Sequence, residues 1–219
     1  MIKNSVDKIF TINLDYRTDR WDHIQKEFKK LGIDNYERFS AIKPDLKNIN
    51  PYFYRNFSLA GKDKNKYKQA CHGTKISQLS CMWYAKIKNK KSLLIIQDDA
   101  VFRENTNKIF DKAINELKNI EWDVLYLTLN HRETPIKVSN HVVKVTGGFS
   151  SLAYITKPNM WNVYLEKALL SGKEMDVFAK DYIQKNYKCY CITPNLAMDI
   201  PGYSDILQGK RNYKKVFGF

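Results

Sequence analysis

The sequence predicts an α/β fold in which a mixed, mainly parallel sheet carries helices on both faces. Two observations predict it. Short apolar runs, such as residues 8–14 and 92–97, have the length of buried strands and end in polar residues. Between such runs lie longer segments whose apolar residues recur at helical spacing, as from Trp21 to Leu31, where Gly32 supplies a C-terminal stop. Strands that alternate with helices are typical of a largely parallel sheet covered on both sides.

The remaining elements follow the same two periods along the chain. Further strands are expected at residues 36–42, 123–127, 141–145, 152–155 and 187–192. Further helices are expected at residues 76–87, 109–117, 158–170 and 176–186. Thr74 is a candidate cap for the first of these helices, and Pro158 suits the first turn of the third, which Gly172 follows. Residues 43–69 show little periodicity, which predicts a long loop.

The composition excludes several classes of protein. With 219 residues, 43% of them hydrophobic, the chain is long enough for one domain with a substantial core. Four cysteines are too few for a disulfide scaffold, and Cys189 and Cys191 are expected on one face of a strand as small core residues. The N-terminus has no apolar signal region and no stretch is long enough to span a bilayer, so we expect a cytoplasmic protein.

A formal net charge of +14 favours anionic partners, which include nucleic acids, anionic membrane surfaces and phosphorylated substrates. The charge is spread thinly, and neither an arginine-rich arm nor a nucleic-acid-binding motif is present, so we expect no nucleic-acid partner. A peripheral contact with an anionic membrane surface remains a candidate. A compositional bias towards Lys and Asn accounts for the charge equally well.

The most informative feature is a pair of adjacent carboxylates, Asp98 and Asp99, directly after the apolar run 92–97. Open α/β sheets hold their ligands at the carboxyl ends of the strands. Hard divalent cations that bridge phosphates prefer oxygen ligands of this kind. The pair therefore predicts a metal–nucleotide site, and the alternative is a pair of turn or cap aspartates at a strand end.

Seven motifs occur together in a fixed order along nearly the whole chain. They are Phe10-Thr11-Ile12-Asn13-Leu14 with Arg17 and Arg20, Gly73-Thr74-Lys75-Ile76-Ser77-Gln78, Leu94-Ile95-Ile96-Gln97-Asp98-Asp99, Trp122-Asp123-Val124-Leu125-Tyr126-Leu127, Ser151-Leu152-Ala153-Tyr154, Met175-Asp176-Val177 and Ser204-Asp205-Ile206. As an ordered set they resemble glycosyltransferase family 25, which includes lipopolysaccharide-type galactosyltransferases and procollagen galactosyltransferases. Where the family has a histidine and a first glutamate, this chain has Gln78 and Gln97.

The resemblance implies a single domain of the GT-A type over residues 1–219, with a nucleotide-sugar half at about 1–105 and an acceptor half at about 106–219. It also implies a metal-dependent transfer of galactose or glucose from a UDP-sugar, with inversion and with Mn²⁺ or Mg²⁺. The acceptor would be a hydroxyl of a saccharide, a glycolipid or hydroxylysine. Because Gln78 and Gln97 depart from the family pattern, the alternative is a binding module that has lost turnover.

On this resemblance we assign donor and metal roles to residues at the ends of the first and third strands. Asp99 is expected to hold the metal, and Asp98 the ribose or a second coordination position. Asn13, Arg17 and Arg20 are placed around the uracil, ribose or diphosphate, since an arginine offers a planar fork to phosphate. The alternative for the arginines is a surface ion pair with Asp15 or Asp19. Ser77, Gln78 and Gln97 are also assigned to the donor site, with a polar position beside the sheet as the alternative for the first two.

Inversion requires a base that deprotonates the acceptor hydroxyl opposite the leaving group. Asp176 is the first candidate, with a helix cap as its alternative, and Asp181 is the second, with a solvated helix position as its alternative. A C-terminal segment with Asp199 and Ser204-Asp205 is expected to close over the nucleotide. Aromatic side chains in the loop at 43–69 are expected either to stack on sugars or to pack against the protein; they are Tyr52, Phe53, Tyr54, Phe57 and Tyr67.

Overall fold

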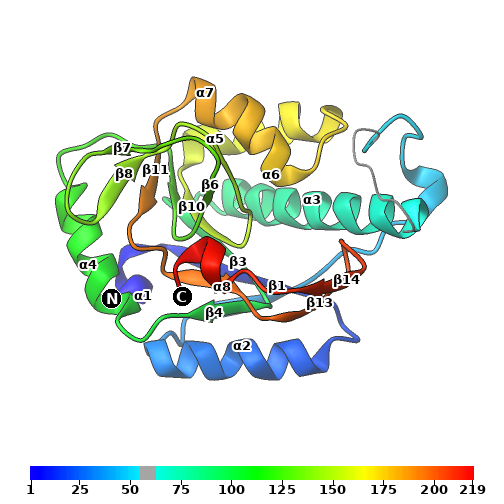
Figure 1. Ribbon diagram of the computed structural model, residues 1–219. Helices are drawn as coiled ribbons and strands as arrows, with labels where there is room; N and C mark the ends of the chain where they lie inside the picture. The colour runs from blue at the N-terminus through cyan, green and yellow to red at the C-terminus, as the bar shows by residue number, and fades with distance from the viewer. Residues whose placement is uncertain (55–62) are drawn as a thin grey trace.

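A computed structural model describes residues 1–54 and 63–219 and contains one large central sheet (Figure 1). Its strands lie in the order β2–β1–β3–β10–β5–β11–β8–β7. Their bounds are β1 Lys8–Asn13, β2 Tyr36–Ser40, β3 Leu93–Gln97, β5 Val124–Tyr126, β7 Ile136–Lys137, β8 Val142–Lys144, β10 Ala153–Thr156 and β11 Cys189–Ile192. Strands β10 and β8 run against the other six. The predicted α/β class with a mixed, mainly parallel sheet is confirmed.

Helices cover both faces of this sheet, as predicted. One face carries α3 (Lys64–Ile87), α5 (Pro158–Val163), α6 (Met175–Phe178) and α7 (Gln184–Asn186), and the π-helical segments η2 (Tyr164–Ala168) and η3 (Ala179–Ile183) continue α5 and α6. The other face carries α1 (Ile2–Ser5), α2 (Thr18–Leu31) and α4 (Thr106–Glu116). Successive strand residues point to opposite faces, so Ile9 packs in the α2 core and Phe10 in the α3 core. In Figure 1 the sheet therefore lies between α2 and α3.

Three short two-stranded sheets lie beside the central one, and the sequence did not predict most of these strands. They pair β4 (Ala100–Phe102) with β12 (Ala197–Asp199), β6 (Asn130–His131) with β9 (Gly148–Phe149), and β13 (Gly202–Ser204) with β14 (Gly209–Arg211). The last described helix, α8, spans Lys214–Phe217. The β4–β12 pair brings Asp199 opposite Ala100, which is next to the predicted acidic pair.

The helix α3 begins at Lys64, well before the predicted start, so the predicted loop is too long and Thr74 is not the cap. The cap is Asp63, whose side chain accepts hydrogen bonds from the backbone N–H groups of Asn65 and Lys66. A one-turn 3₁₀ helix, η1 (Leu46–Asn48), also lies within the predicted loop. Within α3, position 73 is a glycine, and a Cβ at this position would stand 2.5 Å from the Ile42 carbonyl oxygen. The absence of a side chain lets the chain after β2 cross the helix closely.

Several local predictions are confirmed. Gly32 ends α2 in the left-handed conformation, with φ of 63°. Pro158 begins α5, and Cys189 and Cys191 are buried core residues with free thiols. Within the described ranges, no helix has both the length and the apolar character needed to cross a membrane.

Candidate functional site

The carboxylate of Asp98 is buried where β1 and β3 end side by side. Its backbone N–H donates to the Ile12 carbonyl at 3.2 Å, which continues the pairing of the two strands past Gln97. Its carboxylate accepts a hydrogen bond of 2.6 Å from Asn13 Nδ2. Burial and the neighbouring charge of Asp99 raise the pKa of Asp98 to about 6. The chain turns directly after β3, so Asp98 and Asp99 reach one site although neighbouring strand residues would face opposite ways.

Arg20, in the first turn of α2, points into this acidic site. Its Nη1 donates to Asp99 Oδ2 at 3.1 Å and lies 3.4 Å from Asp98 Oδ1. Its Nη2 donates to the Tyr203 carbonyl at 3.2 Å and lies 3.7 Å from Asp205 Oδ2. The predicted alternative, a surface pair with Asp15 or Asp19, therefore does not describe Arg20, whose side chain is only 14% exposed.

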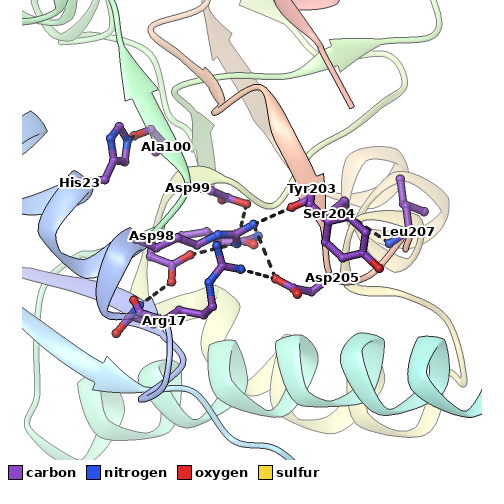
Figure 2. A network of polar contacts seen from close by, with 12 residues as sticks. Arg17, His23, Asp98, Asp99, Ala100, Tyr203, Ser204, Asp205 and Leu207 are labelled. Atoms are coloured by element: carbon purple, nitrogen blue, oxygen red, sulfur yellow. Dashed lines mark hydrogen bonds and ion pairs between the residues drawn. The ribbon is translucent and has the colours of Figure 1, made fainter. Parts of the chain in front are cut away.

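Arg17 forms an ion pair with Asp19, which was one of the alternatives from the sequence, and it also contacts the C-terminal segment. Its guanidinium donates to Asp19 at 2.9 and 2.8 Å and to Asp205 at 2.6 Å. Figure 2 shows Asp98 and Asp99 on one side of this network and Tyr203 and Asp205 on the other. The hairpin β13–β14 is thus fastened to the start of α2.

A third carboxylate, Asp199, joins the acidic pair through the β4–β12 pairing. The backbone N–H of Ile200 donates to the Asp99 carbonyl at 2.7 Å, which fixes the end of β12 beside the turn after β3. Burial and the charge of Asp99 raise the pKa of Asp199 to about 7. Sequence reasoning placed Asp199 only in a closing segment, because a three-residue strand far along the chain carries no clear periodicity.

Two cavities meet at these carboxylates. The first, of about 440 Å³, lies between the strand ends and α3 and is lined by Asp98, Gln78, Lys43 and Lys66 among others. The second, of about 400 Å³, lies on the side of α6 and is lined by Asp176 and Glu174 among others. Both cavities are lined by Arg20, Thr74, Gln97, Asp99, Asp199, Tyr203, Ser204 and Ile206. The acidic site therefore stands at the junction of the two cavities.

Among the described residues, three buried polar atoms without a hydrogen-bond partner belong to residues that line the first cavity: Asp99 Oδ1, Arg20 Nε and Gln78 Nε2. Buried polar groups in proteins are nearly always paired, so a concentration of unpaired ones indicates a ligand site. The orphaned carboxylate oxygen of Asp99 and the oxygen donors beside it fit a hard divalent cation. In the part of the chain that the structure describes, no group of three or more His, Cys, Asp and Glu side chains is already arranged to hold a metal ion.

Two of the predicted donor-site residues have all their polar atoms engaged within the protein. Asn13 donates to Asp98 and to the Arg17 carbonyl and accepts from Arg38 Nε at 2.9 Å. Ser77 donates to the Gly73 carbonyl at 2.7 Å and accepts from the Ile42 N–H at 2.8 Å. Neither is among the residues that line the two cavities, so in this structure they position their neighbours.

Gln78 and Gln97, which stand where the family pattern has a histidine and a glutamate, both line the first cavity. Gln78 is fully buried, and its Oε1 accepts a 2.7 Å hydrogen bond from the buried Tyr154 hydroxyl. This contact leaves its Nε2 as the free donor. Gln97 donates to the Ser151 carbonyl at 2.8 Å and to its hydroxyl at 3.0 Å, which fastens β3 to the loop before β10.

Of the two predicted bases, Asp176 lines the second cavity and Asp181 does not. Asp176 lies in the first turn of α6, one residue inside the helix, and its Oδ1 accepts from the Val177 N–H at 2.9 Å. Burial raises its pKa to about 6, which suits a proton acceptor near neutral pH. Asp181 pairs with Lys173 at 2.6 Å on η3, as its solvated-helix alternative suggested.

Most of the predicted loop aromatics pack against the protein, which was one of the two alternatives. Tyr54 and Tyr67 are buried with Cys71, and Phe53 is partly buried against them. Tyr54 Oη lies 2.9 Å from His72 Nδ1. Tyr67 donates to Glu174 at 2.7 Å and also lines the second cavity. Tyr52 is 67% exposed, whereas the prediction for Phe57 falls outside the described residues.

The fold and the site together define an α/β protein with an acidic cluster beside two cavities at the carboxyl ends of its strands. Residues 6–204 match the sequence model of glycosyltransferase family 25, described as an LPS biosynthesis protein. The chain therefore belongs to glycosyltransferase family 25. This membership supports glycosyl transfer as the activity.

No curated protein sequence matches the chain. Among solved structures, it is similar to A197 from STIV, at 13% identity and a TM-score of 0.49 over 93% of this chain and 92% of that one. It is also similar to a mannose-1-phosphate geranyltransferase from Thermus thermophilus, at 8% identity and a TM-score of 0.42 over 97% of this chain and 79% of that one.

Proposed function

We propose that the chain transfers a hexose, galactose or glucose, from a UDP-sugar to a hydroxyl of a saccharide, glycolipid or hydroxylysine acceptor, with inversion and with Mn²⁺ or Mg²⁺. One observation carries the proposal: in a family 25 chain, two cavities meet at Asp99 and Asp199. A transfer reaction needs a donor and an acceptor space that share one reaction centre. The first cavity is the donor space in this proposal, and the second is the acceptor space.

The chemistry of the first cavity supports a nucleotide diphosphate. Arg20, Lys43 and Lys66 line it and carry positive charge that complements phosphate. The free donors Arg20 Nε and Gln78 Nε2 need acceptor oxygens, which the phosphates and hydroxyls of a nucleotide sugar provide. The hairpin β13–β14 lies along the same cavity, with Ser204 and Asp205 in its lining.

Asp99 and Asp199, with Asp98 beside them, are the residues that would hold a divalent cation. Such a cation, when bound, stabilises the negative charge that develops on a leaving diphosphate. Asn13 donates a hydrogen bond to Asp98, and Arg20 donates one to Asp99. Removal of either contact would therefore displace a carboxylate of the proposed cation site even though both carboxylates are still present. The alternative of plain turn aspartates leaves the orphaned Asp99 oxygen unexplained.

In the second cavity, Asp176 is the proposed base. Its carboxylate would take the proton from an acceptor hydroxyl, and the hydroxyl oxygen would form a bond to the anomeric carbon of the donor sugar. The bond from that carbon to the diphosphate breaks at the same time, and UDP leaves with the electron pair. Attack from the face opposite UDP inverts the anomeric centre.

Calorimetric titration of UDP, UDP-galactose and UDP-glucose, with and without Mn²⁺, tests the donor assignment. We expect uridine nucleotides to bind in a metal-dependent way and the two sugars to differ in affinity. Absence of binding by all three would overturn the proposal. UDP release in the presence of acceptor saccharides then separates an enzyme from the alternative, a binding module without turnover.

The binding-module alternative has one structural observation in its favour. Gln97 carries no charge where the family pattern has a carboxylate, and its amide is engaged with Ser151. Metal-dependent nucleotide binding without any transfer or hydrolysis would favour this alternative, whereas turnover would exclude it.

A further inference from the structure

The charges in the second cavity are separated between its depth and its mouth. Four acidic side chains line it, and all four are half-buried: Asp99, Glu174, Asp176 and Asp199. Three arginines also line it. Arg20 is only 14% exposed and pairs with Asp99, whereas Arg132 and Arg211 are exposed. Among the described residues, Glu174 and Asp176 are in no ion pair, so a molecule that enters this cavity meets the positive charge of Arg132 and Arg211 first and the negative charge of these two carboxylates deeper inside.

In the part of the chain that the structure describes, no carboxylate forms an ion pair with either arginine at the mouth. The ion pairs of residues 1–54 and 63–219 include neither Arg132 nor Arg211. Arg211 instead donates to the neighbouring Lys210 carbonyl at 3.4 Å. Guanidinium groups left without a carboxylate at the entrance of a cavity are well suited to bind carboxylate or phosphate.

A second cation stands beside Arg132 on the ring of Phe149, which also lines the cavity. The Arg132 guanidinium carbon lies 5.7 Å from the centre of the ring, and Lys180 Nζ lies 5.6 Å from it. The carboxylate that pairs with Lys180 is Glu133, at 3.9 Å. Two cations on one ring repel each other, so an anion bound beside them would be stabilised by both.

The backbone holds Arg132 in place at this mouth. Its N–H donates to the Gly147 carbonyl at 2.8 Å, next to the β6–β9 pairing. The carboxylate of Glu133 packs against Gly147, where a Cβ would lie 2.5 Å from it. Glu133 is thereby held against Gly147 on the same turn as Arg132.

We propose, on the basis of the function proposed above, that the acceptor is an anionic saccharide whose carboxylate or phosphate is bound by Arg132 and Arg211. The acceptor then lies with its acidic group at the mouth and a neutral hydroxyl towards Asp176. The opposite orientation would bring the anionic group against the carboxylates of Glu174 and Asp176. The charge separation thus selects both the class of acceptor and its direction in the cavity.

Saturation-transfer NMR on the full chain with UDP and Mn²⁺ tests this proposal. The probes are galactose, galacturonate and galactose 6-phosphate, with the corresponding glucose series. We expect at least one acidic sugar to bind roughly tenfold more tightly than its neutral parent, the size of one charge-assisted contact. The carboxylate and phosphate arms distinguish the two possible anions.

Matched variants assign the effect to the mouth of the cavity. Arg132→Gln and Arg211→Gln should each remove most of the preference for the acidic sugar and leave the binding of the neutral parent unchanged. Lys137→Gln is the control, because Lys137 is exposed on β7 and is not among the residues that line the cavity.

Three results would overturn the proposal: equal binding of acidic and neutral sugars, unchanged preference in both arginine variants, or an equal loss in Lys137→Gln. The last would attribute the preference to the net charge of the chain. UDP binding is measured in the same samples. If UDP binds but the acidic preference is absent, only the acceptor class is wrong; if UDP does not bind, the proposed donor site itself fails.

Discussion

Replacement of Asp176 by Asn should abolish transfer and at the same time stabilise the fold. The substitution preserves the shape of the side chain, and the amide oxygen of Asn can still accept from the Val177 N–H. It removes the ability to take a proton from an acceptor hydroxyl, which costs about 10²–10⁴-fold in turnover for a general base. Nucleotide binding in the first cavity should be unaffected, because Asp176 does not line it.

The expected gain in stability follows from the pKa of Asp176. Burial raises this pKa from 3.8 to about 6, so the folded protein binds the proton more tightly than the unfolded chain does. Ionisation of Asp176 therefore does not lower the free energy of unfolding below about pH 4. The reduction grows as the pH rises and is complete above about pH 6. The difference between the two pKa values corresponds to about 3 kcal/mol. Contact of the half-buried side chain with water reduces this energy. We therefore expect the free energy of unfolding of Asp176→Asn to exceed that of wild type by about 1–3 kcal/mol at pH 8.

Thermal unfolding of wild type and Asp176→Asn at pH 4 and pH 8 measures this difference. For a chain of this length, each kcal/mol raises the midpoint by roughly 2–4 °C. The variant should unfold at a higher temperature than wild type at pH 8 and at nearly the same temperature at pH 4. Wild-type turnover should itself rise with pH through about 6. Turnover retained by the variant, or a midpoint change that is the same at both pH values, would refute the assignment of Asp176 as a buried base.

Three further variants test other parts of the site. Asp99→Asn should abolish Mn²⁺-dependent UDP binding while the circular dichroism spectrum is retained, and unchanged calorimetric binding would remove Asp99 from the metal site. Tyr154→Phe removes the hydroxyl that orients Gln78, and the loss of a contact worth about 1 kcal/mol should weaken UDP binding about fivefold. The double variant Tyr154→Phe with Gln78→Ala should bind UDP as weakly as Gln78→Ala alone. If the two losses of affinity were additive, Tyr154 would not act by orienting Gln78. Asp205→Asn frees the β13–β14 hairpin from Arg17, so amide hydrogen exchange should accelerate there and not in α4; equal exchange in both proteins would contradict the fastening.

The sequence predicted those parts of the site whose signals are local. Asp98 and Asp99 follow a run of four fully buried apolar residues, so the end of the strand and the acidic pair could be identified from one short segment. Gly32 likewise indicated the end of α2, because the left-handed conformation at that position favours glycine. Periodicity and capping depend on neighbours in the chain, and a sequence shows such neighbours directly.

The parts that the sequence did not predict depend on contacts between distant segments. Strands β4 and β12 have three residues each, too few to show a period, yet their pairing brings Asp199 to Asp99. Arg132 and Arg211 line one cavity although they lie far apart in the sequence. The sequence also left open whether Arg20 is a surface residue. Its direction depends on contacts with Tyr203 and Asp205, which are distant in the sequence.

The distribution of charge around Arg20 bears on how nucleotide and metal would bind. The Arg20 guanidinium is shared among Asp98, Asp99 and Asp205. A diphosphate that draws Arg20 towards itself would leave the carboxylates of Asp98 and Asp99, which are largely buried, with less compensation, and an uncompensated buried charge is costly. A cation at Asp99 and Asp199 offsets that cost, so each ligand should strengthen the binding of the other. Linkage requires the two effects to be equal: the factor by which Mn²⁺ tightens UDP binding must be the factor by which UDP tightens Mn²⁺ binding.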